Sequence, residues 1–255
     1  MSNARAVIAA LVAATIVAGL GSHSATHAGD WRTLATGVEY RNLTLKADER
    51  RVTAHALRVD LKRAALRVLD AQTLLGRRRA TVDEYATSTR ALAVINGGFF
   101  DKQGQPLGLV VAEGEVKSKW LKREWGILLV RVTDASIVHA RDYAPNTAIT
   151  QALEVGPRLV VRGQVLKFKD QSARRSAIGL QRDGRVVILA TEGALSLKQL
   201  AELFAASESD SGLGCVEALH LDSGSSTQLS VRGQSPAMFV RSTSPVPNAL
   251  GIFPR

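Results

Sequence analysis

The chain has 255 residues, of which 45% are hydrophobic and 22% are charged, the values of an ordinary globular protein. They exclude a disordered tail, a coiled coil and a polytopic membrane protein. Because 33 Lys and Arg face 23 Asp and Glu, the formal net charge is +10, and such a surface attracts polyanions.

The first 28 residues have the features of a secretory signal peptide. Arg5 supplies a positive charge, residues 6–20 are uncharged and apolar, and Thr26-His27-Ala28 approximates a small-residue cleavage site. The apolar stretch is shorter than the roughly 20 residues that a membrane-spanning helix needs. We therefore expect cleavage after Ala28, a mature domain of residues 29–255, no stable membrane span after cleavage, and a periplasmic or secreted protein.

The expected export of the protein indicates which anions its basic surface attracts. The Lys and Arg residues are scattered with few aromatic residues between them, so no nucleic-acid partner is expected. Phosphate-bearing glycans or lipid head groups suit an exported protein better. A basic surface with no specific partner is the alternative.

Most of the mature chain is predicted to form strands, because short apolar or alternating runs are bounded by turn residues. Glu113-Gly114, Arg162-Gly163 and Arg182-Asp183-Gly184 each separate two such runs, which is typical of hairpins. The pattern predicts a single α+β domain of mixed, mainly antiparallel sheets with a few helices. The expected strands are 38–46, 52–61, 66–69, 91–95, 107–112, 125–132, 136–139, 151–155, 158–161, 176–181, 185–190, 218–221, 228–231 and 249–252.

Two helices are predicted from capping boxes, in which a hydroxyl residue is followed three positions later by Glu or Gln. Thr81 and Glu84 start a helix from about Val82 toward Ser88, and Ser196 and Gln199 start a second helix with an apolar face. The polar segment 207–214 that follows is linker-like but too short to divide domains. The lone Cys215 is interpreted as a small buried hydrophobe.

Four segments place polar or glycine residues at the end of an apolar strand, where clefts usually form. Paired glycines allow backbone N–H groups to approach a ligand, a strand-starting Arg can clamp a phosphate, and an Asp in a Gly/Ser turn has a constrained carboxylate. Each segment taken singly also has a structural interpretation as a turn or a surface charge. The segments are 96–101, 155–158, 174–179 and 221–226.

The amino-acid sequences of these segments and their order along the chain resemble the motifs of the phosphodiester glycosidase family. INGGFF, VGPRLV, RRSAIG, a helix, LDSGSS and VPNALG follow one another between about Leu92 and Phe253. That family includes the lysosomal uncovering enzyme, which removes N-acetylglucosamine from a phosphodiester, and exported bacterial relatives. The resemblance implies an exported hydrolase that cleaves a sugar–phosphodiester linkage in an envelope or extracellular glycan.

The resemblance also carries site residues to this chain. Asn96, Gly97 and Gly98 match the NGGFF block, and Arg175 matches the Arg of an R-T-A-I-G block. Within a D-G-G-G-S block it places Asp222, Gly224, Ser225 and Ser226.

Two departures from the family pattern put activity in question. Ser223 occupies the first glycine of the D-G-G-G-S block, and His220 stands where family members often carry Asn. If residue 223 must have a positive φ, a non-glycine residue there costs roughly 1–2 kcal/mol.

The chemistry of a sugar–phosphate linkage assigns roles to these residues. Cleavage passes through an oxocarbenium-like state, which needs a carboxylate near the anomeric carbon and a cation on the departing phosphate. We assign Asp222 as general base or nucleophile and Arg175 as phosphate clamp. Asn96 and the Gly97-Gly98 amides then position the substrate, with Gly224, Ser225 and Ser226. Glu192, expected at a strand end, is the candidate second carboxylate, although it could equally cap a turn.

Other functions remain open. An aspartic peptidase needs a second catalytic Asp, for which Asp210-Ser211-Gly212 is a poor candidate. The sequence lacks the G-x-S-x-G turn of a serine hydrolase. Its five isolated His residues offer no metal-ligand spacing, so no cofactor or metal is expected, although binding of a hard cation by Asp222 and carbonyl oxygens is left open. A non-catalytic envelope protein that binds anionic glycan is the alternative from another class. The sequence leaves the oligomeric state open.

Overall fold

The computed structural model describes residues 27–255 except 48, 147, 170 and 233–237. The predicted signal peptide therefore lies almost entirely outside the described residues. In the described part, three antiparallel sheets accompany three α-helices, which confirms the predicted fold class. None of the described helices combines the length and the apolar character needed to cross a bilayer.

The largest sheet has the strand order β1-β3-β4-β15-β14-β16-β12-β13, with β2 paired to β3. Its strands are β1 (His27–Ala28), β2 (Arg32–Ala35), β3 (Val38–Ala47), β4 (Arg50–Val59), β12 (Arg158–Val161), β13 (Gln164–Val165), β14 (Ser172–Gln181), β15 (Val186–Ser196) and β16 (Cys215–His220).

The two smaller sheets have five strands each. The second sheet comprises β7 (Val110–Ala112), β8 (Glu115–Ser118), β9 (Gly126–Val130), β10 (Ala135–His139) and β11 (Gln151–Val155). The third sheet comprises β5 (Ala64–Asp70), β6 (Ala93–Asn96), β17 (Leu229–Val231), β18 (Met238–Val240) and β19 (Asn248–Pro254).

Both predicted helices are confirmed, and their capping boxes are formed. These are α2 (Val82–Thr89) and α3 (Leu197–Ala205). A shorter helix, α1 (Ala71–Leu75), is capped by the carboxylate of Asp70 and was not predicted. Three 3₁₀ turns complete the elements: η1 (Ala140–Asp142), η2 (Glu208–Asp210) and η3 (Gly224–Ser226).

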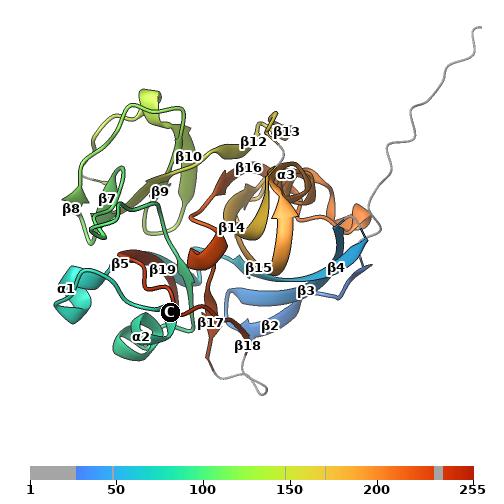
Figure 1. Cartoon of the computed structure of the whole chain (residues 1–255), viewed down its shortest axis with the longest axis horizontal. Coiled ribbons are helices and arrows are strands. Elements are labelled where there is room, and N and C mark those ends of the chain that lie inside the picture. The colour runs from blue at the N-terminus through green and yellow to red at the C-terminus, as the bar shows by residue number, and fades with distance from the viewer. Residues whose placement is uncertain (1–26, 48, 147, 170, 233–237) are drawn as a thin grey trace, which may run out of the picture.

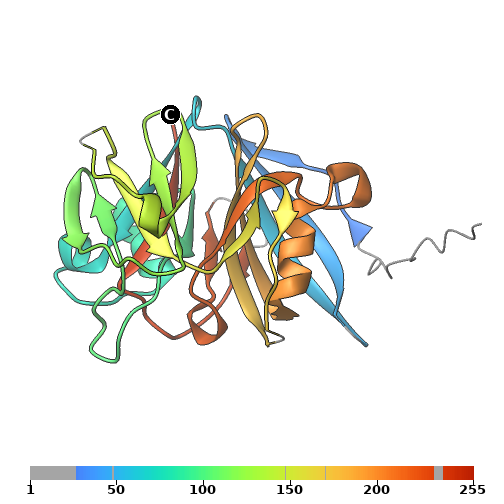
Figure 2. The same ribbon diagram turned by 90° about the horizontal axis from the view of Figure 1, so that it is seen from above.

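The large sheet is covered differently on its two faces. The central core, which includes Leu57, Ile95, Leu128 and Ile188, joins one face to the two smaller sheets. The α3 core, which includes Leu189, Leu195, Phe204 and Cys215, lies on the other face beneath α3. Figure 2 shows α3 on one side of the large sheet and the smaller sheets on the other, while Figure 1 shows α1 and α2 beside the third sheet. Cys215 is buried in the α3 core, as predicted.

The three predicted hairpin turns are confirmed, because the strands on either side of each turn pair antiparallel. Two strands are longer than predicted. β14 begins at Ser172 and β15 continues to Ser196, so the expectations that Arg175 begins a strand and that Glu192 ends one are wrong. The extra residues pair with each other across an irregularity, a partner that neither segment reveals locally.

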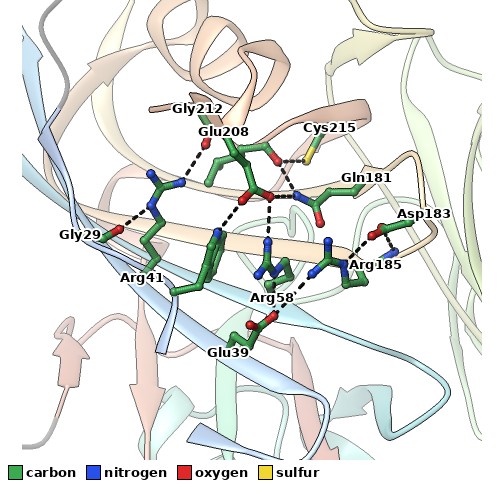
Figure 3. Close-up of polar contacts among 12 residues, drawn as sticks. Gly29, Glu39, Arg41, Arg58, Gln181, Asp183, Arg185, Glu208, Gly212 and Cys215 are labelled. Carbon is green, nitrogen blue, oxygen red and sulfur yellow. Dashed lines mark hydrogen bonds and ion pairs between the residues drawn. The ribbon is translucent and has the colours of Figure 1, made fainter. Parts of the chain in front are cut away.

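The segment 207–214, expected to be linker-like, is anchored by a charged network. Glu208 accepts hydrogen bonds from Arg58 (2.8 Å) and Gln181 (2.7 Å) at Oε1 and from Trp31 (3.1 Å) at Oε2. The Arg58 guanidinium lies 4.3 Å from the centre of the Trp31 ring, and Arg41 donates to the carbonyl of Gly212 (Figure 3). This network ties β3, β4 and the residue Trp31 to the loop after α3.

The network predicts a pH dependence of stability. Burial alone would raise the pKa of Glu208, but the donors on Gln181, Arg58 and Trp31 outweigh it and hold the pKa below its ordinary value. A carboxylate with a lowered pKa stabilises the fold above the unfolded-state value of about 4.3 and loses that contribution as pH falls through the folded pKa. In urea denaturation, Glu208→Gln should therefore flatten the fall in the free energy of unfolding below about pH 5.

Glu208 is partly exposed, so this contribution is expected to be about 1 kcal/mol or less. Glu49→Gln, at an exposed position in the β3–β4 turn, is the matched control and should keep the unmodified pH profile. Equal flattening in both variants would contradict the prediction.

Candidate active site

The NGGFF and LDSGSS segments meet although they are 126 residues apart in the chain. Asn96 is the last residue of β6, and its Nδ2 donates to the carbonyl of Asp222 (2.7 Å). The backbone N–H of Asp222 donates to the carbonyl of Gly97 (3.0 Å). The backbone of Asp222 is thus held on both sides by the first segment.

Asn96 is fully buried and joins three segments. Its Oδ1 accepts from the hydroxyl of Ser176 in β14 (2.7 Å) and from the N–H of Gln228 ahead of β17 (3.1 Å). Since its side-chain amide already holds Asp222, the polar atoms of Asn96 face protein partners. These contacts position the backbone of Asp222, and the substrate contact expected from the sequence stays a prediction.

The paired glycines allow a close approach of backbone to backbone. A Cβ on Gly97 would lie 2.0 Å from Oδ1 of Asn248, and one on Gly98 would lie 3.3 Å from the carbonyl of Glu154. The N–H of Gly98 donates to Oδ1 of Asn248 (2.7 Å). These glycines therefore let the NGGFF segment pack against Asn248 and β11, and the Gly98 amide is already engaged.

Asn248 is a site residue that the sequence analysis missed. It is fully buried at the start of β19 and acts on the NGGFF segment from 150 residues away. The available signal was an Asn within the VPNALG block. Glu154, next to Gly156-Pro157, was also missed: it is buried, its Oε2 accepts from the N–H groups of Leu109 and Leu121, and burial raises its pKa.

Asp222 lies two residues beyond β16 and is half-buried. Burial raises the pKa of its carboxyl, and hydrogen bonds from the Ser226 side chain and the Ser223 backbone oppose the rise only in part. The Ser223 N–H donates to Oδ1 at 2.9 Å. A carboxyl group whose pKa is raised in this way suits proton transfer near neutral pH.

The two departures from the family pattern contact each other. Oγ of Ser223 lies 2.7 Å from Nε2 of His220, and Nδ1 of His220 lies 3.3 Å from the carbonyl of Gly156. Burial and the nearby Arg175 lower the pKa of His220 to about 4, so the neutral ring donates from Nδ1 and accepts at Nε2. The lowered pKa makes His220 a weaker base than a free imidazole.

The backbone of Ser223 is not strained, so the free-energy cost that a positive φ would impose on a non-glycine residue here does not arise. Ser223 has φ −138° and ψ −173°, an extended conformation, and the positive φ of the turn (68°) falls on Gly224. Ser225, which stands at the third glycine of the D-G-G-G-S block, is a further departure and is exposed in η3. Ser226 is buried.

The pairing of Ser223 with His220 predicts coupled substitutions. His220→Asn and Ser223→Ala should each lower the free energy of unfolding by roughly 1 kcal/mol, because each removes the hydrogen bond between the Ser223 hydroxyl and Nε2 of His220. The double variant should lose less than the sum, since it removes both partners. A double-mutant cycle by chemical denaturation measures this coupling, and strictly additive losses would show that the contact contributes nothing.

Two adjacent arginines point to opposite faces of β14. Arg175 is buried: its Nε donates to the carbonyl of Leu195 (2.8 Å), Nη1 lies 3.3 Å from Nε2 of His220, and Nη2 donates to the carbonyl of Gln171. No carboxylate lies within ion-pair distance of it among the residues that the structure describes. Burial lowers its pKa, and its engaged donors favour a role through His220 over a direct grip on phosphate.

Arg174, which was not singled out, lies on the face of the central core. It pairs with Ala194 of β15, and its guanidinium donates to the carbonyls of Gly224 (3.3 Å) and Arg241 (2.9 Å). It therefore lies against the turn that follows Asp222.

Glu192 lies on the same face as Arg174, two residues before Ala194 in β15. Its side chain is half exposed, and Oε1 lies 2.7 Å from Nε2 of His55. It does not cap a turn. No described interaction joins Glu192 directly to Asp222.

The second Asp-Ser-Gly sequence belongs to a different part of the molecule. Asp210 ends η2 and accepts a hydrogen bond from the hydroxyl of Ser207 at 2.6 Å. This turn lies in the network around Glu208, and no described contact relates it to Asp222. Within the described ranges, no group of three or more His, Cys, Asp and Glu side chains is arranged to hold a metal ion.

Comparison with known proteins relates most of the chain to one family. Residues 89–253 match the family model described as "Phosphodiester glycosidase". This range contains Asn96, Arg175, Glu192 and Asp222. No curated protein matches the sequence significantly.

Solved structures share the fold at low sequence identity. The catalytic domain of zebrafish N-acetylglucosamine-1-phosphodiester alpha-N-acetylglucosaminidase, auto-inhibited by its pro-peptide, is 18% identical with a TM-score of 0.69, over 91% of this chain and 89% of that one. A hypothetical protein from Synechocystis is 19% identical (TM-score 0.68), and the match covers 86% of this chain but only 62% of the other. A Burkholderia pseudomallei structure named "Putative exported protein" is 13% identical (TM-score 0.64), over 91% and 97% of the two chains.

Proposed function

The chain belongs to the phosphodiester glycosidase family, and we propose that it is an exported hydrolase that cleaves the bond between the anomeric carbon of a sugar and a phosphodiester oxygen. The substrate class is a phosphate-bearing glycan of the envelope or the extracellular space. The observation that carries the proposal is the half-buried Asp222 carboxyl, whose backbone is fixed by the Asn96 side chain and the Gly97 carbonyl.

Asp222 acts as the general base in this proposal. It takes a proton from water, whose oxygen bonds to the anomeric carbon while the bond to the phosphodiester oxygen breaks and its electrons leave with the phosphate. The products are a free sugar and a phosphomonoester. The leaving phosphate needs little protonation, so one proton-transferring carboxyl suffices, and its raised pKa suits that task.

The remaining charges divide between the two faces of β14. Glu192, on the exposed continuation of the central-core face, is the second carboxylate and stabilises the positive charge that develops at the anomeric carbon. Arg174, beside the Gly224 carbonyl, is better placed than Arg175 to meet the departing phosphate. Arg175 instead supports His220 and, through it, Ser223.

The proposal is tested with a panel of sugar 1-phosphodiesters in water enriched in ¹⁸O. We expect release of reducing sugar with ¹⁸O on the sugar, because the bond that breaks is carbon–oxygen. Label on the phosphate would indicate a phosphodiesterase and refute the proposed reaction. Saturable binding of phosphorylated glycan without turnover would instead support a non-catalytic glycan-binding protein.

A further inference from the structure

A chain of hydrogen bonds leads from the central core to Glu192. The hydroxyl of Tyr40 in β3 lies 2.8 Å from Nδ1 of His55 in β4, and Nε2 of His55 lies 2.7 Å from Oε1 of Glu192 in β15. Tyr40 and His55 are 4% and 7% exposed, whereas the Glu192 side chain is 51% exposed. Two buried residues thus end on a carboxylate that solvent reaches.

The two ends of this series of hydrogen bonds determine which atom donates in each bond. A carboxylate oxygen accepts hydrogen bonds, so Nε2 of His55 donates to Oε1 of Glu192. Nδ1 is then the acceptor, and the Tyr40 hydroxyl must donate to Nδ1. The amide of Asn42, 3.5 Å away, can donate to the Tyr40 oxygen. Every bond in the series then has one donor and one acceptor, which is the arrangement expected for the Nε2–H tautomer of a neutral His55.

The strand register places the hydrogen-bonded series of Tyr40, His55 and Glu192 beside the candidate active site. Ser176, which holds Asn96, pairs with Ala190, and Ala190 pairs with His55 on the next strand. Glu192 lies two residues along β15 from Ala190 and two before Ala194, the partner of Arg174. Arg174 in turn contacts the turn after Asp222.

This face is open to solvent where Glu192 lies. Ser176, Ala190 and His55 form one row of paired residues across this face. Val38 and Leu57, which lie on the same face before this row, are buried in the central core. Within the row, Asn42, which pairs with His55, is exposed, and beyond the row Ala194 is exposed and Thr53 is half-buried. The row around His55 therefore marks the edge of the core, and Glu192 stands on the open part of the sheet with the Asp222 turn at its side.

We propose that Tyr40 and His55 are positioning residues for Glu192, and that they fix its carboxylate with Oε2 free to face a substrate on this open part of the sheet. The inference rests on the proposed function, in which Glu192 is the second carboxylate. His55 Nε2–H occupies Oε1, and Oε2 makes no hydrogen bond within the described part of the chain. The ring of Tyr40 is stacked on that of His55, with 6.0 Å between the ring centres, and is covered by Arg32. This packing limits the movement of the relay formed by Tyr40 and His55.

The kinetic test compares variants of the full chain on a sugar 1-phosphodiester. Tyr40→Phe should lower kcat roughly ten- to hundredfold with little change in KM, because the remote hydroxyl affects only the orientation of the Glu192 carboxylate. His55→Gln, which keeps an amide N–H, should retain more activity than His55→Leu. Tyr85→Phe is the matched control, since it removes a buried hydroxyl bonded to the Val246 carbonyl far from this relay, and it should keep kcat.

Coupling decides whether Tyr40 acts through Glu192. In a Glu192→Gln background, Tyr40→Phe should cause no further loss of kcat. Undiminished kcat in Tyr40→Phe, or full additivity of the two losses, would overturn the inference while leaving the proposed function intact.

A spectroscopic arm separates the inference from the proposed function. Long-range ¹H–¹⁵N spectra should show His55 as the Nε2–H tautomer in the unmodified protein, and Tyr40→Phe should shift its Nδ1 resonance. An Nδ1–H tautomer would overturn the inference even if the enzyme is active. Absence of turnover in the unmodified protein, with the tautomer as expected, would instead contradict the proposed function.

Discussion

Asp222→Asn should lower the rate of sugar release from a 1-phosphodiester by about 10²–10⁴-fold, the usual contribution of a general base. The amide is nearly isosteric and can still accept from the Ser223 N–H, so the geometry of the turn should be kept. The amide cannot take a proton from water. Initial rates at saturating substrate, together with kcat/KM, measure the loss.

The same substitution should preserve or raise stability at neutral pH. The pKa of Asp222 is raised by burial, so the ionised carboxylate is disfavoured in the folded state. Its contribution to the free energy of unfolding therefore falls as pH rises from the unfolded-state value of about 3.9 to the folded pKa. Removing the charge removes this cost, and chemical denaturation at pH 7 should show an Asn variant at least as stable as the parent.

Two Asp→Asn controls show whether the effect belongs to Asp222. Asp101, whose carboxylate accepts from the Gln105 N–H beyond the NGGFF block, should be replaceable with little loss of rate. Asp210→Asn tests the peptidase alternative, because a catalytic aspartate pair would lose its activity in either variant. Equal losses in the Asp210 and Asp222 variants, or unchanged turnover in Asp222→Asn, would refute the assignment of the base.

Features that depend on neighbouring residues were predictable from the sequence. The caps of α2 and α3 require only a hydroxyl and a Glu or Gln three residues later, and both formed. The three hairpins follow from turn residues between apolar runs. The family motifs likewise indicated the family, because each contains its own pattern.

Features that depend on a distant partner were not predictable. β14 and β15 extend because each supplies the other with hydrogen bonds, so the polar segment around Glu192 is strand rather than turn. The start of β14 also decides which arginine faces which core, since neighbouring residues of a strand point to opposite faces. For this reason the motif identified Arg175, whereas the geometry brings Arg174 to the face of Glu192.

The strongest structural effect is expected at Asn96. Asn96→Ala removes the donor to the Asp222 carbonyl and the acceptor for both the Ser176 hydroxyl and the Gln228 N–H. Each buried group left unsatisfied costs about 1–3 kcal/mol, so the free energy of unfolding should fall by roughly 3–5 kcal/mol. That is a large part of the 5–15 kcal/mol typical of a domain, and the fall should appear as a lower urea midpoint.

Loss of activity in Asn96→Ala would follow from loss of fold alone, so a second variant is needed to separate the two. Asn96→Asp keeps an acceptor for Ser176 and Gln228 but turns a second oxygen toward the Asp222 carbonyl, 2.7 Å away. The repulsion should displace Asp222 and lower kcat by more than tenfold under conditions in which the protein is still folded. Asn146→Ala, in an exposed loop, is the control. A folded Asn96→Asp variant with unchanged kcat would show that this carboxamide does not position Asp222.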